Sequence, residues 1–138
     1  MATTKTFSIE NHPLANSDGV VIGVEVIFHG ELVHGTPALT YKELQNKISE
    51  LERLAASDVI AINLTDLYRW DSLGVTNVLE PIARINRWLK SRGRFPIGII
   101  ADKDSDNFKA ARDKFPNEFN SEILPWFGSL KEFTNQID

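Results

Sequence analysis

The chain has 138 residues, of which 42% are hydrophobic and 25% are charged, and its formal net charge is −4. This size and composition allow one substantial buried core and exclude disorder over the whole length. The chain holds no cysteine, which excludes disulfides, thiol catalysis and thiolate metal sites.

The charge distribution argues against a nucleic-acid partner, and the hydropathy argues against insertion into a membrane. The basic residues are mostly dispersed along the chain, and the densest basic stretch, residues 84–94, is interpreted as the solvated side of a helix, whereas binding to nucleic acid requires a concentrated basic face. No apolar run approaches the length of about 20 residues that spans a bilayer, and residues 1–10 lack the apolar core of a signal peptide. We therefore expect a cytoplasmic protein without direct membrane insertion and without a nucleic-acid partner.

The first part of the chain is rich in strand signals. Residues 5–10 alternate apolar and polar side chains and predict a short strand, while the Pro, Asn, Asp and Gly of residues 11–19 predict a turn or loop. Residues 20–28 are dense in Val and Ile and predict a strand inside a sheet. Gly30 interrupts this run, and residues 31–33 are expected to form a second short strand.

Helical and strand patterns alternate in the middle of the chain. Apolar residues at helical spacing predict helices over residues 39–56 and 72–91. The apolar runs 59–64 and 95–101 predict buried strands. Pro81 lies inside the second helix, which it is expected to kink or interrupt.

The last part of the chain continues the alternation. Residues 104–115 predict a third helix with Phe108, Ala111 and Phe115 on one side, and residues 123–127 and 128–137 predict a short strand and a closing helix. The order of the elements predicts an α/β fold, with helices packed on a mixed, mainly parallel sheet of about five strands.

The segment 62–74, which reads I-N-L-T-D-L-Y-R-W-D-S-L-G, joins a buried strand to the second helix. Partners and ligands of open α/β sheets bind beyond the carboxyl ends of the strands, where this loop is expected. Asp71 and Ser72 are residue types that cap helices. A phosphate on Ser72 would also lie at the positive end of the helix dipole, where it would change the affinity for a charged partner. Capping and a phosphorylation switch are compatible interpretations.

This segment resembles the STAS domain, whose L-x-x-L-x-x-x-D-S-x-G pattern matches residues 64–74. Residues 30–32 similarly resemble the G-E-L that follows the second strand of that family. The resemblance covers about residues 20–115 of a single STAS-like domain over 1–138. In that domain residues 1–19 form an N-terminal strand and loop, and residues 116–138 form a closing strand and helix.

The resemblance implies a bacterial protein of signal transduction and transcription regulation that is not an enzyme. In the anti-sigma factor antagonists of this family, the domain binds an anti-sigma factor that is also a Ser/Thr kinase, and phosphorylation of a serine breaks the complex. By position, the phosphorylated residue is Ser72. The implied partner-binding residues are Glu31, Asp66, Trp70, Asp71, Ser72, Leu73 and Gly74. Trp70 is expected to anchor the partner, because interfaces are enriched in tryptophan.

Three departures from the sporulation-type members of the family keep an alternative open. Val33 stands where those members often have Asp, Leu73 where they often have a second Ser, and Pro81 lies within the second helix. STAS domains also occur in transporters and signalling scaffolds. The alternative is therefore a constitutive interaction subunit in which Ser72 only caps the helix. The oligomeric state stays open, with a homodimer among the possibilities.

The sequence favours no metal, cofactor or catalytic residue. His12, His29 and His34 match no common zinc spacing. The eight glycines form no phosphate-binding loop, and no serine lies in a G-x-S-x-G elbow.

A set of acidic residues near the third predicted helix has part of the spacing of a calcium loop. Asp102, Asp104 and Asp106 are spaced by two, but the Gly and Glu that such a loop requires are missing. We expect an acidic loop in which Asp104 or Ser105 caps the third helix.

Overall fold

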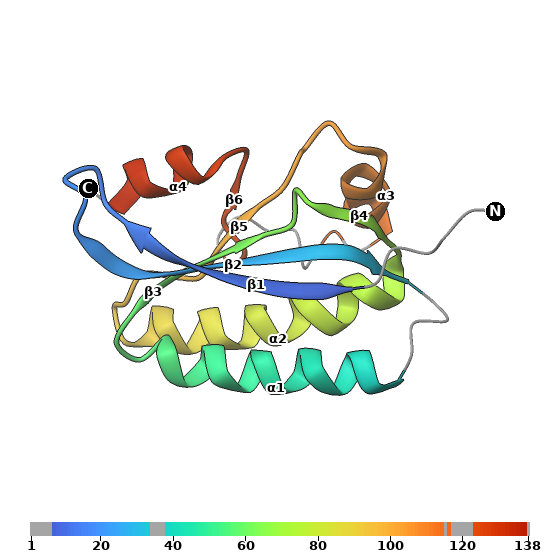
Figure 1. The fold of residues 1–138 in the computed structure, drawn as a ribbon, viewed down its shortest axis with the longest axis horizontal. Helices are drawn as coiled ribbons and strands as arrows, with labels where there is room; N and C mark the ends of the chain where they lie inside the picture. The colour runs from blue at the N-terminus through green and yellow to red at the C-terminus, as the bar shows by residue number, and fades with distance from the viewer. Residues whose placement is uncertain (1–6, 34–37, 115, 117–122, 138) are drawn as a thin grey trace.

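Figure 1 shows the fold in a computed structural model that describes residues 7–33, 38–114, 116 and 123–137, without the side chains of residues 38, 39 and 72–75. The elements follow one another as β1 (Ser8–Ala15), β2 (Val21–Leu32), α1 (Ala38–Leu54), β3 (Val59–Asn63), β4 (Leu67–Trp70), α2 (Ser72–Ser91), β5 (Gly98–Ile100), α3 (Asp106–Lys114), β6 (Trp126–Phe127) and α4 (Leu130–Ile137).

One mixed sheet forms the middle layer. Its strand order is β1-β2-β3-β5-β6, and β4 pairs with β2 outside this path. The β1–β2 pair is antiparallel and the other pairs are parallel. Helices α1 and α2 lie on one face of the sheet, and α3 and α4 lie on the other (Figure 1). The predicted α/β class with a mainly parallel sheet is confirmed, and β4 raises the predicted five strands to six among the described residues.

Strand β1 is longer than its sequence predicts. Residues 11–15 were expected in a loop, yet β1 pairs with β2 from Ser8, opposite His29, to Ala15, opposite Val21. Pro13 is tolerated because β1 is an edge strand, where a missing N–H costs no ladder hydrogen bond. The turn itself is confined to the residues after β1, where the Asn16 side-chain oxygen accepts the N–H groups of Asp18 and Val20, both at 3.0 Å.

Strand β2 is a single strand in place of the two that were expected. Gly30 does not end it but forms a bulge, at which the register with β4 shifts between Gly30 and Glu31. Gly30 has a φ of 87°, a backbone conformation that glycine adopts without strain. The bulge thereby carries β2 on to Leu32, alongside β4.

Helix α2 runs unbroken from Ser72 to Ser91, so of the two expectations for Pro81, a kink or a local break, the local break is wrong. Buried side chains of α2 on both sides of Pro81 belong to the core, and this packing holds the helix together. The helix ends as predicted at Gly93, with a φ of 67°. The N–H of Arg94 donates to the carbonyl of Leu89 at 2.9 Å, and the N–H of Gly93 donates to that of Lys90 at 3.1 Å. This pair of bonds is a Schellman cap.

Strand β5 is shorter than the predicted run 95–101. The buried side chain of Asn86 binds the backbone of Ile97 on both sides, accepting its N–H at 2.7 Å and donating to its carbonyl at 3.1 Å. The same amide donates to the carbonyl of Ile123 at 2.8 Å. Because the Asn86 side chain takes up both backbone hydrogen-bonding groups of Ile97, these groups do not pair with a neighbouring strand, and β5 begins only at Gly98.

The core has two parts, of different size. The larger cluster joins the sheet to α1, α2 and α3. The smaller cluster lies under α4 and consists of the buried side chains of Leu14, Ala61, Ile100 and Phe133. Phe108 and Ala111 are buried as predicted, and Phe115 lies outside the described residues. Among the described residues, none of the helices combines the length and the apolar content of a membrane span.

Candidate functional site

The start of α2 lies just beyond a strand end. Strand β4 ends at Trp70, and Ser72 is the first residue of α2, which places Asp71 at the N-cap position. The predicted beginning of this helix is therefore confirmed. The side chains of Ser72 and Leu73 lie outside the described part of the chain.

A tight turn leads from β3 into β4 and is held by Asn63. The side-chain oxygen of Asn63 accepts the backbone N–H of Thr65 at 2.9 Å and its hydroxyl at 2.6 Å. The Asn63 amide donates to the buried carboxylate of Glu25 at 2.9 Å. Since Glu25 belongs to β2, these bonds fix the turn to that neighbouring strand. Asn63 is not among the residues predicted from the sequence, although an Asn at a strand end is a recognised turn signal.

Strand β4 replaces most of the loop that was expected between Asp66 and Asp71. It pairs in parallel with the end of β2, where Glu31 lies opposite Arg69 and Leu32 lies opposite Trp70. The structure thus brings Glu31, which was selected from a distant motif, beside the segment that leads to Ser72. The pairing forms between residues that are far apart in sequence, so local patterns did not reveal it.

Trp70 is buried, and its selection as an exposed partner anchor is corrected. Its side chain is 6% exposed and belongs to the larger core cluster. The exposed aromatic ring of β4 is that of Tyr68, at 57%. The carbonyl of Tyr68 accepts a hydrogen bond from the Asn107 side chain at 3.0 Å, which ties β4 to α3. Tyr68 was not predicted from the sequence, because only the difference in burial distinguishes its side chain from that of Trp70.

Asp66 is exposed and lies near a histidine of strand β2. Its carboxylate is 3.7 Å from Nδ1 of His29, and Nε2 of the same ring is 3.4 Å from the carboxylate of Glu10 on β1. Glu10 also binds His12, and this hydrogen bond lowers the pKa of Glu10 and raises the pKa of His12. Asp66 is therefore the first of a row of neighbouring polar side chains that leads through His29 to Glu10 and His12 on the edge strand β1.

These polar side chains form no metal centre. Among the described residues, no group of three or more His, Asp and Glu side chains has a geometry that could hold a metal ion. His34 lies outside the described residues. In the acidic loop, Asp102 accepts the N–H of Asp104 at 3.0 Å, and the Ser105 hydroxyl accepts the N–H of Phe108 at 3.1 Å. Ser105 is thus the cap of α3, as one of the two expected alternatives proposed.

A small hollow opens beside β4, at the carboxyl ends of the strands. Its volume is about 220 Å³. It is lined by Leu64, Thr65, Leu67, Tyr68, Trp70, Ala101, Asp102, Ser105 and Asn107. The predicted position of the loop beyond the strand ends is therefore correct. Together, the exposed Tyr68 and Asp66, the end of β2 and the start of α2 form one surface, which we call the β4–α2 surface.

The fold is that of an anti-sigma factor antagonist. The crystal structure of such an antagonist from Mycobacterium paratuberculosis covers 95% of this chain and 96% of its own, with a TM-score of 0.59 and 16% sequence identity. The predicted STAS-like architecture is confirmed at the level of the fold. No family model matches the chain.

A curated relative is similar in sequence to most of the chain. Glutamate–tRNA ligase 1 of Ehrlichia ruminantium (strain Gardel) is 25% identical over 136 residues, a stretch that covers 89% of this chain. The chain spans 30% of the length of that ligase.

Proposed function

We propose that this chain is a regulatory domain, without enzymatic activity, that binds a protein partner in the cytoplasm through the β4–α2 surface. Phosphorylation of Ser72 by a partner kinase switches this binding. The observation that carries the proposal is the placement of Ser72 as the first residue of a 20-residue helix, one residue after strand β4 with its exposed middle, in the fold of an anti-sigma factor antagonist.

Electrostatics supports a switch at this position. A phosphate adds a charge of about −2 at neutral pH, and a helix N-terminus favours an anion. Asp71 is adjacent in sequence, the exposed Asp66 directly precedes strand β4, and the exposed Arg69 lies within it. The modification would therefore make this surface more acidic, which disfavours an acidic partner surface and changes the contacts with a basic one.

Aminoacylation is not proposed for this chain. The chain spans 30% of the ligase it matches, and its net charge of −4 does not favour tRNA. A constitutive interaction subunit of a transporter or scaffold, in which Ser72 has no regulatory role, is the competing function.

The experiment compares partner binding by the parent chain with that of Ser72→Ala and Ser72→Asp. We expect Ser72→Ala to bind like the parent, and Ser72→Asp to bind about tenfold more weakly or worse, because like charges at an interface are costly. Ser129→Asp is the matched control. Ser129 also lies at a helix start, where its hydroxyl accepts the N–H of Glu132 at 3.2 Å, but the helix is α4.

Phosphosite mapping after incubation with the partner kinase completes the test. The proposal predicts phosphate on Ser72 and its loss in Ser72→Ala. Normal partner binding by Ser72→Asp, in a variant whose thermal unfolding matches that of the parent, would favour the constitutive subunit instead.

A further inference from the structure

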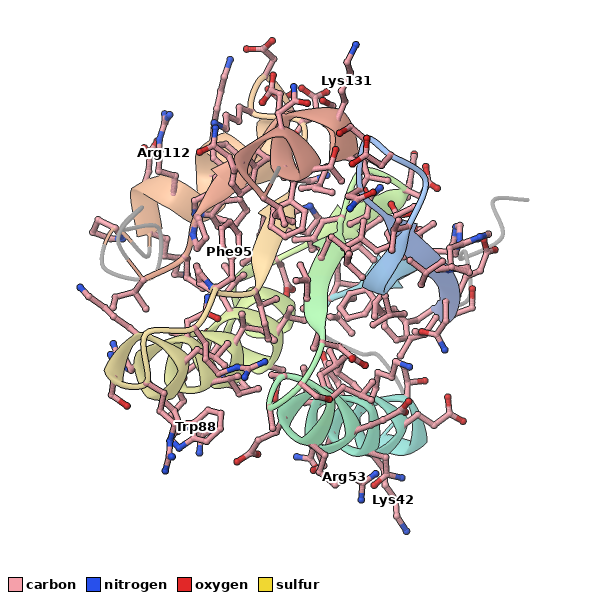
Figure 2. The ribbon with its side chains drawn as sticks, turned by 90° about the vertical axis from the view of Figure 1, so that its left-hand side faces the viewer. Lys42, Arg53, Trp88, Phe95, Arg112 and Lys131 are labelled. Atoms are coloured by element: carbon pink, nitrogen blue, oxygen red, sulfur yellow. The ribbon has the colours of Figure 1, made fainter. Side chains whose placement is uncertain are left out.

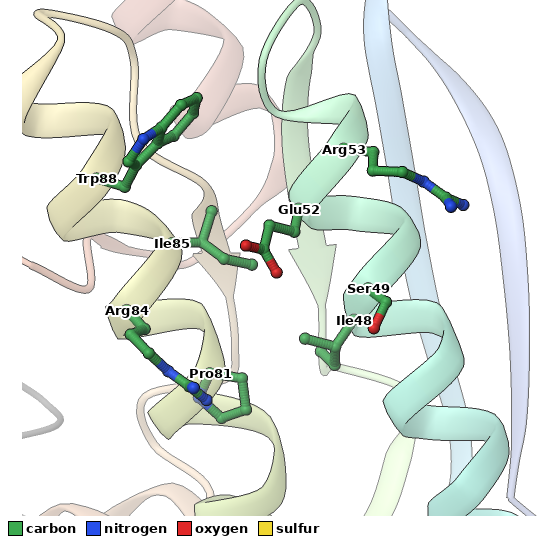
Figure 3. Close-up of a pocket in the computed structure, with 8 residues that line it drawn as sticks. All are labelled: Ile48, Ser49, Glu52, Arg53, Pro81, Arg84, Ile85 and Trp88. Carbon is green, nitrogen blue, oxygen red and sulfur yellow. The ribbon is translucent and has the colours of Figure 1, made fainter.

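A groove runs between α1 and α2 on the side of these helices that faces away from the sheet (Figures 2 and 3). It consists of adjoining hollows of about 700 Å³ and about 430 Å³ that share part of their lining. The shared residues are Ile48, Ser49, Glu52, Pro81 and Arg84. On α2 the lining extends from Thr76 to Trp88, a length of about 18 Å at the helical rise of about 1.5 Å per residue. The groove is elongated and follows both helices.

The floor of the groove is apolar. Figure 3 shows Ile48 of α1 and Ile85 of α2 pointing into the space between the helices, and these side chains are 8% and 6% exposed. Pro81 lines the same floor. Trp88 forms the end of the groove and is 40% exposed, and the Arg92 guanidinium lies 4.9 Å from the centre of its ring. A large aromatic side chain is thus held in place at a solvent-exposed position.

The groove lies beside a strongly basic stretch in a chain whose net charge is −4. Residues 81–101 contain no Asp or Glu. They carry five exposed cations, Arg84, Arg87, Lys90, Arg92 and Arg94. Two acidic side chains also line the groove: Glu52, which faces Ile85 (Figure 3), and Glu80, which lies toward the end away from Trp88, so the positive charge is concentrated at the Trp88 end. The local excess of positive charge selects an acidic partner.

We propose that the α1–α2 groove docks an acidic amphipathic helix of a partner protein, about three turns long. A third helix suits a groove between two neighbouring helices, and its apolar side chains at helical spacing would contact Ile48, Ile85 and Trp88. Its carboxylates would pair with Arg84, Arg87 and Arg92. This docking surface is separate from the β4–α2 surface and does not depend on phosphorylation of Ser72.

The test uses two synthetic amphipathic peptides of about 14 residues, which share the same leucine face and carry either Glu or Lys on their flanks. Binding to the full chain is measured by fluorescence anisotropy of a label on the peptide. We expect the acidic peptide to bind at least about tenfold more tightly than the basic one. Trp88→Ala should weaken its binding by about tenfold or more, because exposed tryptophans dominate such contacts.

Two further variants test whether the acidic peptide binds at the groove and through the basic side chains beside it. Arg84→Glu combined with Arg87→Glu should abolish the preference for the acidic peptide. Tyr68→Ala, which removes a comparably exposed aromatic side chain from the β4–α2 surface, should leave peptide binding unchanged. Circular dichroism confirms that each variant keeps its helix content.

Several results would overturn the proposal. These are equal binding of the two peptides, full binding by Trp88→Ala, and a preference that survives the double charge reversal. Vesicles containing anionic lipid and an RNA hairpin are tested alongside. Tighter binding of either one than of the acidic peptide would assign the basic stretch to a membrane surface or to nucleic acid instead.

Discussion

His29 lies between two carboxylates and links separate parts of the fold. Its ring nitrogens are 3.7 Å from Asp66, in the turn before β4, and 3.4 Å from Glu10, on the edge strand β1. The ring is partly buried, with a side-chain exposure of 33%, so water screens these contacts less than at a fully exposed pair. Through His29, the turn that leads toward Ser72 is connected to the edge of the sheet.

The neighbouring pair of Glu10 and His12 permits a direct test by titration. The hydrogen bond to Glu10 raises the pKa of His12 above its ordinary value of 6.5. We expect Glu10→Gln to return the pKa of His12 toward 6.5, measured by NMR titration of the imidazole signals. Since the folded pKa is the raised one, the contribution of His12 to stability is present below pH 6.5 and is lost as the pH rises through the folded pKa.

The lowered pKa of Glu10 has the opposite consequence at acid pH. Its contribution to stability is present above the ordinary value of 4.5 and is lost as the pH falls through the lowered pKa. The Glu10–His12 pair thus contributes most to stability between pH 4.5 and pH 6.5. An unchanged His12 titration in Glu10→Gln would contradict the pairing.

Two asparagines show what sequence reveals at the residue scale. Asn63 and Asn86 both bind backbone groups through their side chains, one at a turn and the other within the core. The first follows a strand, where a turn-forming Asn is expected. The second lies in a helix, and its partners Ile97 and Ile123 are distant in sequence. No local pattern indicates such a bond.

At the scale of elements, strands β2 and β3 approach each other closely at Gly23. A Cβ atom at Gly23 would lie 1.7 Å from the carbonyl oxygen of Val59, its partner in the parallel register. Only a glycine allows the two strands to approach so closely at this position. The requirement stems from the backbone of the neighbouring strand, which cannot move like the end of a side chain.

We expect Gly23→Ala to lower the free energy of unfolding by about 1–3 kcal/mol, because the strands must shift to admit the methyl group. The measurement is urea denaturation followed by circular dichroism. Gly128→Ala is the control, since its Cβ would meet the flexible carboxylate of Glu132 at 3.4 Å. Similar losses of stability in the two variants would argue against the close approach of β2 and β3.

Strand β4 is the element that local patterns did not predict. Its four residues have two buried ends and an exposed middle, a pattern without the alternation of a half-buried strand. It forms because the bulge at Gly30 brings the end of β2 alongside it. Its presence moves Trp70 into the core and leaves Tyr68 on the surface.

At the scale of the whole molecule, the sheet is covered on both faces, and α4 closes the smaller core cluster. Phe133 is fully buried there, and its ring lies 5.2 Å from Phe127 and 5.9 Å from Phe95, centre to centre. The rings meet edge to face, an arrangement that stabilises aromatic pairs. The C-terminal helix is thereby attached to β5, β6 and the segment before β5.

We expect Phe133→Ala to lower the free energy of unfolding by about 3–5 kcal/mol, the usual cost of emptying a buried aromatic site. That is a large part of the total stability of about 5–15 kcal/mol typical of a protein domain. Phe95→Ala is the matched control, because Phe95 touches the same ring but is 40% exposed. Urea denaturation compares the two. Equal effects would show that α4 contributes little to the core.

The sequence by itself determined the α/β class, the start of α2 at Ser72 and the courses of α1, α2 and β3. These features depend on the spacing of apolar residues and on capping residues within a few turns of each other, which the sequence displays directly. Only the tertiary structure decided the length of β1, the existence of β4, the burial of Trp70 and the groove between α1 and α2. Each of these results from contacts between segments far apart in the chain, such as Gly30 with Leu67, that no local pattern encodes.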